Sequence, residues 1–175
     1  LLLSYLMLIK LKEILVHMNN YITYMLYIQK RLKQLMPTKA DVGAAGYDLY
    51  VPCDSLVYPG RNIIPLDFAM ELDHTFEATI RPRSGFSAKG MEGVLKNGKT
   101  TRVDADVLLG TIDETYRGNV GVIIKSYETE PFVITRGTRI AQMVISQCFM
   151  GDLELANELS ETERGEGGFG HSGTN

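Results

Sequence analysis

Beyond residue 36 the chain shows no helical hydrophobic period of any length. It is a succession of short apolar stretches separated by turn residues, a pattern typical of an all-β sandwich or barrel. Dipeptides such as Pro59-Gly60 and Arg136-Gly137 lie between the stretches and favour turns. The pattern predicts strands at residues 27–32, 47–51, 62–66, 68–72, 76–81, 120–126, 132–135 and 139–149. The expected fold class is therefore all-β.

Two local signals refine this expectation. Asn97-Gly98 follows the apolar pair Val94-Leu95 and precedes residues 101–103, which predicts a hairpin with a two-residue turn. We interpret residues 93–106 as a β-arm that protrudes from the domain. Residues 84–89 predict a single helical turn with Ser84 as its N-cap.

Composition bounds the domain organisation. Of the 175 residues, 45% are hydrophobic and 22% are charged, which is ordinary for a globular protein. No repeat or change of composition separates residues 37–160. We therefore expect one β-domain over residues 25–160, followed by a flexible Gly-rich tail over residues 161–175.

The N-terminal segment has a different character. Residues 1–9 are nearly all apolar, but Lys10, Lys12 and Glu13 follow, and no apolar run reaches the roughly 20 residues that span a bilayer. The basic region and small-residue cleavage site of a signal peptide are not visible. We interpret residues 1–24 as a leader or upstream-translated segment, with an amphipathic partner helix as the alternative, and expect no membrane association.

The net charge and the two cysteines limit which binding partners and which cellular compartment are expected. The formal charge of −3 argues against a sequence-independent grip on nucleic acid, which needs a basic surface. Cys53 and Cys148 lie far apart in the sequence, so neither a metal knuckle nor a disulfide framework is proposed. We expect a reducing, cytoplasmic location.

The last residues carry the strongest chemical signal. Residues 164–173 read Arg-Gly-Glu-Gly-Gly-Phe-Gly-His-Ser-Gly. The glycines cannot form a core, but the segment offers a guanidinium group, a hydroxyl, an aromatic face and many backbone N–H groups. Such a tail can close over a nucleoside polyphosphate. A solvated terminus without function is the alternative.

Four further short blocks of sequence are each weak evidence for a function when taken alone. Arg83 and the turn at Ser84-Gly85 can face an anion, or form an exposed loop corner. Asp113 can orient a water molecule, or cap a β-turn. Residues 45–49 suit a turn into a strand, and residues 139–144 suit a buried strand whose Gln142 bonds to another segment. A small barrel has few deep cavities, so a ligand site at a subunit boundary is plausible.

Together and in this order, the blocks resemble the five motifs of the trimeric deoxyuridine triphosphatase (dUTPase) family over residues 37–175. The matching residues are 45–49, 82–86, 112–118, 139–142 and 164–170. The resemblance implies a jelly-roll-like β-barrel that forms a homotrimer, with each active site built from all three chains. It also implies hydrolysis of dUTP to dUMP and pyrophosphate by water attack on the α-phosphorus, which limits uracil in DNA and supplies dUMP for dTMP synthesis.

The resemblance also implies roles for residues of the barrel. Asp113 would hold the attacking water and meet the sugar 3′-hydroxyl, and Tyr116 would pack on the deoxyribose and exclude ribonucleotides. The residues expected to contact phosphate oxygens are Arg83, Ser84, Gly85 and Gln142. Asp48 would organise the phosphate and metal region. Mg²⁺ would be held by the substrate's own oxygens, with no direct protein ligand and with Asp48 reaching it only through water.

For the tail, the resemblance implies a lid. Arg164 and Ser172 would clamp the γ-phosphate while Phe169 stacks on uracil and Gly170 contacts the substrate. Closure of the lid would order the triphosphate and exclude bulk water.

The chain departs from the family pattern at several positions. Val107 stands where many relatives have Asn, Asn119 where Glu is common, Asp67 where Gly is common, and residues 91–106 are longer than usual. Two alternatives remain open. One is a dCTP deaminase, or a bifunctional deaminase and dUTPase, of the same fold. The other is a nucleotide-sensing interaction module that uses the arm at residues 91–106.

Overall fold

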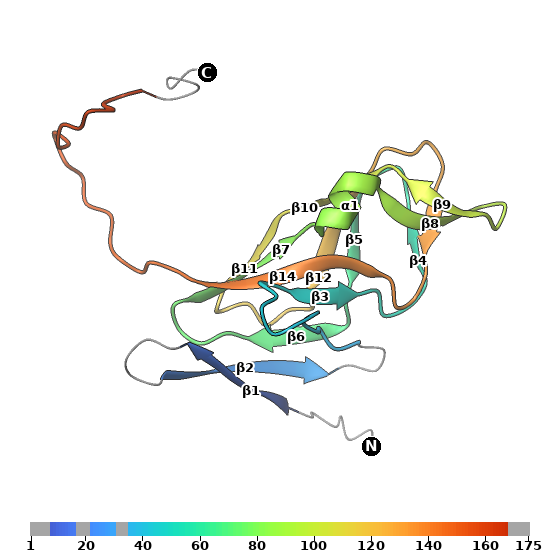
Figure 1. Ribbon diagram of the computed structural model, residues 1–175, viewed down its shortest axis with the longest axis horizontal. Coiled ribbons are helices and arrows are strands. Elements are labelled where there is room, and N and C mark those ends of the chain that lie inside the picture. Colours follow the sequence, from blue (N-terminus) through green and yellow to red (C-terminus); the bar gives the residue numbers. More distant parts are fainter. Residues whose placement is uncertain (1–7, 17–21, 31–34, 168–175) are drawn as a thin grey trace.

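The computed structural model describes residues 8–16, 22–30 and 35–167, the first two stretches by their backbone alone (Figure 1). It is all-β, as the pattern of short apolar stretches predicts, and forms the jelly-roll-like barrel that the resemblance implies. The strands are β1 (Leu8–Val16), β2 (Ile22–Lys30), β3 (Tyr47–Tyr50), β4 (Ser55–Val57), β5 (Gly60–Pro65), β6 (Phe68–Glu71), β7 (Phe76–Arg81), β8 (Met91–Leu95), β9 (Thr100–Val103), β10 (Ala105–Leu108), β11 (Gly110–Ile112), β12 (Gly121–Ser126), β13 (Phe132–Ile134) and β14 (Arg139–Gln147). Helix is confined, among the described residues, to α1 (Ser84–Lys89), and no described helix has the length and apolar character needed to cross a membrane.

The strands form four antiparallel sheets that enclose one core. The sheet orders are β1-β2-β6, β10-β12-β5, β11-β7-β14-β3 and β4-β13-β8-β9. In β12, Val122 and Ile124 are fully buried while their neighbours are partly exposed, the alternation expected when one face of a strand meets the core. Phe68 and Phe132 are the largest of the fully buried side chains. Burial of these rings and of the surrounding aliphatic side chains is the main force that stabilises the barrel.

The central sheet, β11-β7-β14-β3, positions the residues of interest. β14 lies between β7 and β3, and it carries Gln142 opposite Arg81 on one side and opposite Asp48 on the other. β7 continues into α1, and β3 follows the turn at residues 40–46. One sheet therefore brings the first, second and fourth sequence blocks together.

The helical turn is present, but the prediction of its cap is wrong by one residue. The N-cap is Arg83, with extended φ and ψ of −83° and 143° and no side-chain capping bond. The backbone N–H groups of Phe86 and Ser87 both donate to the Arg83 carbonyl oxygen, at 2.9 and 3.0 Å, so the first turn closes there. Ser84 is consequently the first helical residue.

The hairpin at Asn97-Gly98 is also present, with a different turn from the one predicted. The Leu95 N–H donates to the Lys99 carbonyl oxygen at 2.9 Å, and Gly98 has a φ of 79°. Asn97 does not have the positive φ that a two-residue type I′ turn requires, so the loop is longer and ends on the glycine. The sequence signal located the hairpin and misassigned its turn type.

The arm is shorter than the predicted residues 93–106. β8 pairs with β13 of the barrel, and Met91 and Val103 are buried at its base. A Cβ atom on Gly93 would lie 2.7 Å from a ring carbon of Phe132, so this glycine permits close packing. Only the end of the β8–β9 hairpin projects from the barrel (Figure 1).

The described part of the N-terminal segment forms two strands. β1 and β2 pair with each other, and β2 pairs with β6, with Tyr27 opposite Glu71 (Figure 1). Residues 27–30 of the predicted strand 27–32 form the later part of β2, and residues 31–32 lie outside the described residues. The described backbone of the segment is strand where a helix was the alternative. The division of the chain at residues 24 and 160 stays a prediction.

Candidate functional site

A cleft of about 450 Å³ opens where the turn at residues 40–46 meets β3, β14 and the start of α1. Its lining residues are Ala40, Ala44, Ala45, Gly46, Asp48, Arg83, Ser84, Gly85 and Gln142. All five barrel residues that sequence reasoning assigned to the phosphate side are among them. Only Asp113 and Tyr116 of the predicted barrel residues lie elsewhere.

Asp48 forms ion pairs with two arginines at the cleft. The residue is 8% exposed, and its two carboxylate oxygens accept from Arg83 Nε at 2.8 Å and Arg139 Nη1 at 3.1 Å. Arginine binds carboxylates and phosphates with the same planar donor array, so each guanidinium is partly oriented before any ligand arrives. Two guanidinium groups and one carboxylate leave one positive charge in excess, which suits an anion.

Gln142 ties the sheet to the loop before α1. Its Nε2 donates to the Pro82 carbonyl oxygen at 2.9 Å. Gly46 lies beside it, and a Cβ atom there would be 3.0 Å from Gln142 Oε1 and 3.2 Å from the Met143 carbonyl oxygen. The glycine of the first block therefore lets the turn lie directly against β14.

Gly85 is required neither by the backbone nor by packing within the chain. It has no positive φ, and a Cβ atom at this position would meet no atom within 4 Å. Because Gly85 lines the cleft, a side chain there would project into space that a ligand would use. The absence of a side chain is best explained by what binds in the cleft.

Asp113 and Tyr116 lie on the exposed loop that follows β11. The Tyr116 N–H donates to the Asp113 carbonyl oxygen at 3.0 Å, and the Tyr116 hydroxyl donates to the Asn119 carbonyl oxygen at 3.0 Å. The ring curls over Gly118, where a Cβ atom would come within 2.3 Å of the tyrosine hydroxyl. Gly118 thus permits the ring to lie flat along the loop, with 45% of Tyr116 exposed.

The register separates Asp113 from the cleft of its own chain. Gln142 is opposite Arg81, whereas Ile112 is opposite Ala78, which precedes Arg81 by three residues in β7. At about 3.3 Å per residue, Asp113 lies on the order of 13 Å along the sheet from the level of Gln142. One chain does not bring its own Asp113 to the phosphate side of its own cleft.

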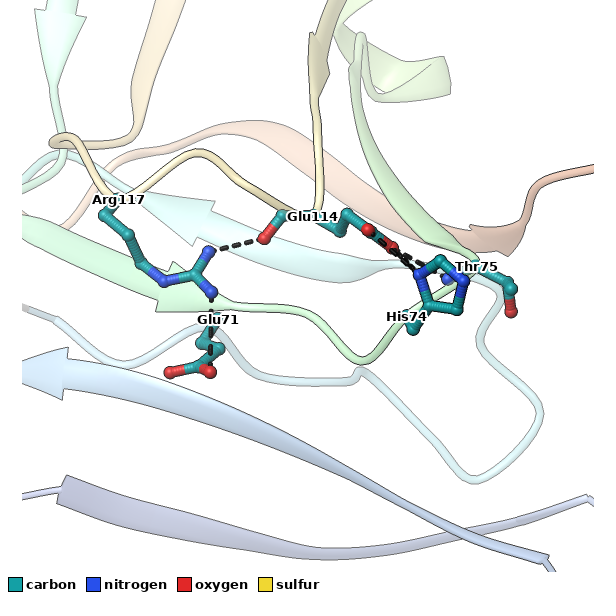
Figure 2. A network of polar contacts seen from close by, with 5 residues as sticks. All are labelled: Glu71, His74, Thr75, Glu114 and Arg117. Atoms are coloured by element: carbon teal, nitrogen blue, oxygen red, sulfur yellow. Dashed lines mark hydrogen bonds and ion pairs between the residues drawn. The ribbon is translucent and has the colours of Figure 1, made fainter. Parts of the chain in front are cut away.

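A polar network beside Asp113 was missed by sequence reasoning (Figure 2). The Glu114 carboxylate lies 3.0 Å from His74 Nδ1 and accepts from the Thr75 N–H at 2.8 Å. The hydrogen bond from His74 and then that from Thr75 hold the pKa of Glu114 below its ordinary value. Arg117 donates to the Glu114 carbonyl oxygen and lies 3.4 Å from Glu71. No local pattern links His74 to a residue forty positions away.

Cys148 lies next to this network, at the end of β14. Its N–H donates to the Thr75 carbonyl oxygen at 2.7 Å. Burial raises the pKa of the Cys148 thiol, and the carboxylates of Glu77, Glu114 and Asp113 raise it further. The thiol is therefore held in its protonated, weakly nucleophilic form.

The C-terminal tail leaves the barrel after β14. Residues 148–167 contain no strand or helix and lead away from the sheets (Figure 1). Arg164 Nε donates to the Gly167 carbonyl oxygen at 2.7 Å, a contact within the tail itself. Phe169, Gly170 and Ser172 lie outside the described residues, so the predicted clamp stays a prediction.

The donor set bears on metal binding. Within residues 35–167, no three His, Cys, Asp or Glu side chains gather to hold a metal ion. Both Asp48 oxygens already accept from guanidinium groups. The expectation that Mg²⁺ has no direct protein ligand stays a prediction.

Comparison with known proteins gives a consistent result. The family described as dUTPase matches residues 33–173. The chain is 41% identical over 143 residues to the deoxyuridine 5′-triphosphate nucleotidohydrolase of Beijerinckia indica, covering 79% of this chain and 82% of that protein. It is 42% identical over 149 residues to the protein of the same name from Syntrophotalea carbinolica, covering 82% and 94%. Among solved structures, a Staphylococcus bacteriophage 80alpha dUTPase with dUPNHPP is similar with a TM-score of 0.72 at 25% identity, covering 85% of this chain and 98% of that one.

Proposed function

The chain belongs to the dUTPase family, and from that premise we propose how its residues hydrolyse dUTP to dUMP and pyrophosphate. The observation that carries the assignment to this cleft is the buried Asp48, which holds Arg83 and Arg139 at its rim. The relatives act, by their names, on deoxyuridine 5′-triphosphate. Neither the deaminase alternative nor a purely binding role is favoured by these relatives.

The triphosphate occupies the cleft lined by Arg83, Ser84, Gly85 and Gln142. Arg83 supplies a guanidinium that Asp48 has already oriented. Ser84 and Gly85 precede the first N–H groups bonded within α1, so their own N–H groups are free to meet phosphate oxygens. The Gly85 position leaves the space that this approach needs.

Asp113 holds the attacking water and supplies the general base or water-orienting group. Because it lies on the order of 13 Å along the sheet from the phosphate side of its own cleft, we propose that it serves the cleft of a neighbouring chain. The enzyme would then be a homotrimer with shared sites, and the tail carrying Arg164, Phe169, Gly170 and Ser172 would close the site from the third chain. A closed cycle of three chains permits every site to be completed in the same way.

Tyr116 packs against the deoxyribose, as its exposed ring on Gly118 permits. A 2′-hydroxyl would need space that the ring occupies. Val107 is buried in β10, and its apolar side chain has no group that could hydrogen-bond to a base. Base recognition must rely on other groups of the loop and the tail.

Mg²⁺ would be held by oxygens of the triphosphate, with Asp48 reaching it only through water. When bound, it would neutralise phosphate oxygens and so make attack by water easier. A cytoplasmic location is part of the proposal. It rests on the two cysteines, which lie far apart in the sequence and suggest no disulfide framework, as is usual in a reducing compartment.

Substrate and product are tested by incubating the protein with each dNTP and Mg²⁺. We expect pyrophosphate from dUTP and little from dATP, dCTP, dGTP or dTTP. Ammonia released from dCTP would indicate the deaminase alternative. Absence of pyrophosphate with dUTP would contradict the proposed function.

Shared sites are tested by complementation between two inactive variants. Asp113→Asn and a chain lacking residues 164–175 are mixed after unfolding and refolding together. If the aspartate and the tail come from different chains, about a quarter of the sites in randomly mixed trimers contain both intact parts. Activity no greater than the sum of the two separate variants would place both parts on one chain.

A further inference from the structure

Glu114 directly follows the water-holding Asp113, and its carboxylate is bound to a different turn of the barrel. His74 Nδ1 lies 3.0 Å from both carboxylate oxygens, and the Thr75 N–H donates to Oε2 at 2.8 Å (Figure 2). His74 and Thr75 belong to the turn between β6 and β7. The contacts therefore join the loop after β11 to that turn.

Thr75 is held in an unusual conformation at this junction. Its φ is 73°, in the left-handed region that a β-branched residue rarely adopts. Its N–H faces Glu114, and its carbonyl oxygen accepts from the Cys148 N–H at 2.7 Å. Thr75 thus contacts both the loop that carries Asp113 and the first residue after β14. Strained backbone of this kind persists where its surroundings over-determine it.

The Asp113 carboxylate has no such support of its own. It is exposed, and within the part of the chain that the structure describes it makes no hydrogen bond or ion pair. Its position depends on the loop backbone. That backbone is fixed by Glu114 on one side and by the Tyr116 N–H bond to the Asp113 carbonyl oxygen on the other.

Resting on the proposed function, we propose that Glu114 is a positioning residue for dUTP hydrolysis, which holds the Asp113 loop in place through His74 and Thr75. Glu114 touches no substrate in this arrangement. A purely stabilising role is the competing explanation, but exposed ion pairs contribute little to the free energy of unfolding. A displacement of a catalytic group by about 1 Å can lower a rate on the order of 100-fold.

The experiment measures kcat and KM for dUTP in four proteins. Glu114→Ala should lower kcat at least tenfold and leave KM within about threefold, because the phosphate cleft is untouched. Glu114→Gln should recover most of the loss, since its amide oxygen can still accept from the Thr75 N–H. Glu71→Ala is the matched control: it removes a Glu from the same network, at the exposed Arg117 pair, and should change kcat less than twofold.

Two further proteins, Asp113→Asn alone and Asp113→Asn with Glu114→Ala, separate positioning from stability. In the Asp113→Asn background, Glu114→Ala should not lower the residual kcat further, because the group that it positions is already gone. An additional tenfold loss in that background would overturn the proposal. So would a kcat for Glu114→Ala within twofold of the unmodified chain.

The outcomes also distinguish this proposal from the proposed function. If the unmodified chain does not hydrolyse dUTP, the proposed function fails. If the unmodified chain hydrolyses dUTP and the kcat of Glu114→Ala is within twofold of it, only the positioning role fails. Should Glu114→Ala not fold, His74→Ala decides, because it keeps the Thr75 bond. A kcat about threefold lower then supports the proposal, and an unchanged kcat overturns it.

Discussion

The phosphate cleft and the Asp113 loop are built in opposite ways. In the cleft, Asp48, Arg83 and Gln142 are tied to one another or to adjacent backbone by bonds within one chain. Asp113 lies on an exposed loop, and its carboxylate makes no hydrogen bond or ion pair among the described residues. On the proposed mechanism, phosphate binding would be prepared within each chain, whereas turnover would depend on Asp113, which lies on an exposed loop. Substitutions in the two regions should separate binding and stability from rate.

The largest effect is expected for Asp113→Asn. The amide cannot take a proton from water, so kcat should fall about 1,000-fold. Binding of a non-hydrolysable dUTP analogue, measured by calorimetry, should change less than twofold, because the cleft is unaltered. The control is Asp104→Asn, an exposed carboxylate outside both regions, which should keep full activity. An active Asp113→Asn protein would remove the aspartate from the mechanism.

Deletion of residues 164–175 is expected to have the next largest effect. Loss of the lid should lower kcat about 100-fold by leaving the triphosphate poorly ordered. The melting temperature should not change, because Arg164 contacts Gly167 of the tail itself. Pyrophosphate release and thermal unfolding measure the two properties separately. A truncated chain with full activity would show that the tail is not a lid.

Gly85→Ala is a sharper probe of the cleft. The methyl group fits the isolated chain without contact, so the melting temperature should stay the same. It would occupy space used by phosphate, and KM for dUTP should rise about tenfold, or about 1.4 kcal/mol. Gly43→Ala is the matched control, because its Cβ atom would make only an ordinary 3.4 Å contact outside the cleft lining. Equal KM values for the two variants would mean that phosphate does not approach Gly85.

The sequence predicts features that depend on local patterns and misses contacts between distant segments. Strands of the barrel core follow from local apolar periods, and most of the cleft follows from the resemblance of short blocks. The three-residue strands β4 and β11 are too short for a period of two to be visible. The ion pair of Asp48 with Arg139 and the bond of Glu114 with His74 depend on register and turn geometry across the fold. Such long-range contacts leave no local signal.

Asp48→Asn should affect stability and binding together, unlike Asp113→Asn. The amide can accept from one guanidinium but no longer neutralises two. Because Arg83 and Arg139 are partly exposed, the free energy of unfolding should fall by only about 1 kcal/mol. Analogue affinity should fall about threefold, since Arg83 is no longer oriented. Urea unfolding and calorimetry measure the two losses. A change in one without the other would mean that the cleft is not built as a unit.

The smallest effect is expected in how the free energy of unfolding depends on pH, through the Glu114 carboxylate beside Asp113. Hydrogen bonds from His74 and Thr75 lower the pKa of Glu114 in the folded chain below its ordinary value of 4.5. The resulting stabilisation is fully present above pH 4.5 and is lost as the pH falls through the lower, folded-state pKa. The stability difference between the unmodified chain and Glu114→Gln, measured by urea unfolding, should therefore shrink between pH 6 and about pH 3.5. His74→Ala should weaken this trend, because His74 makes the largest contribution to the lowered pKa. A difference that stays constant over the range would mean that the loop is not held by the ionised carboxylate.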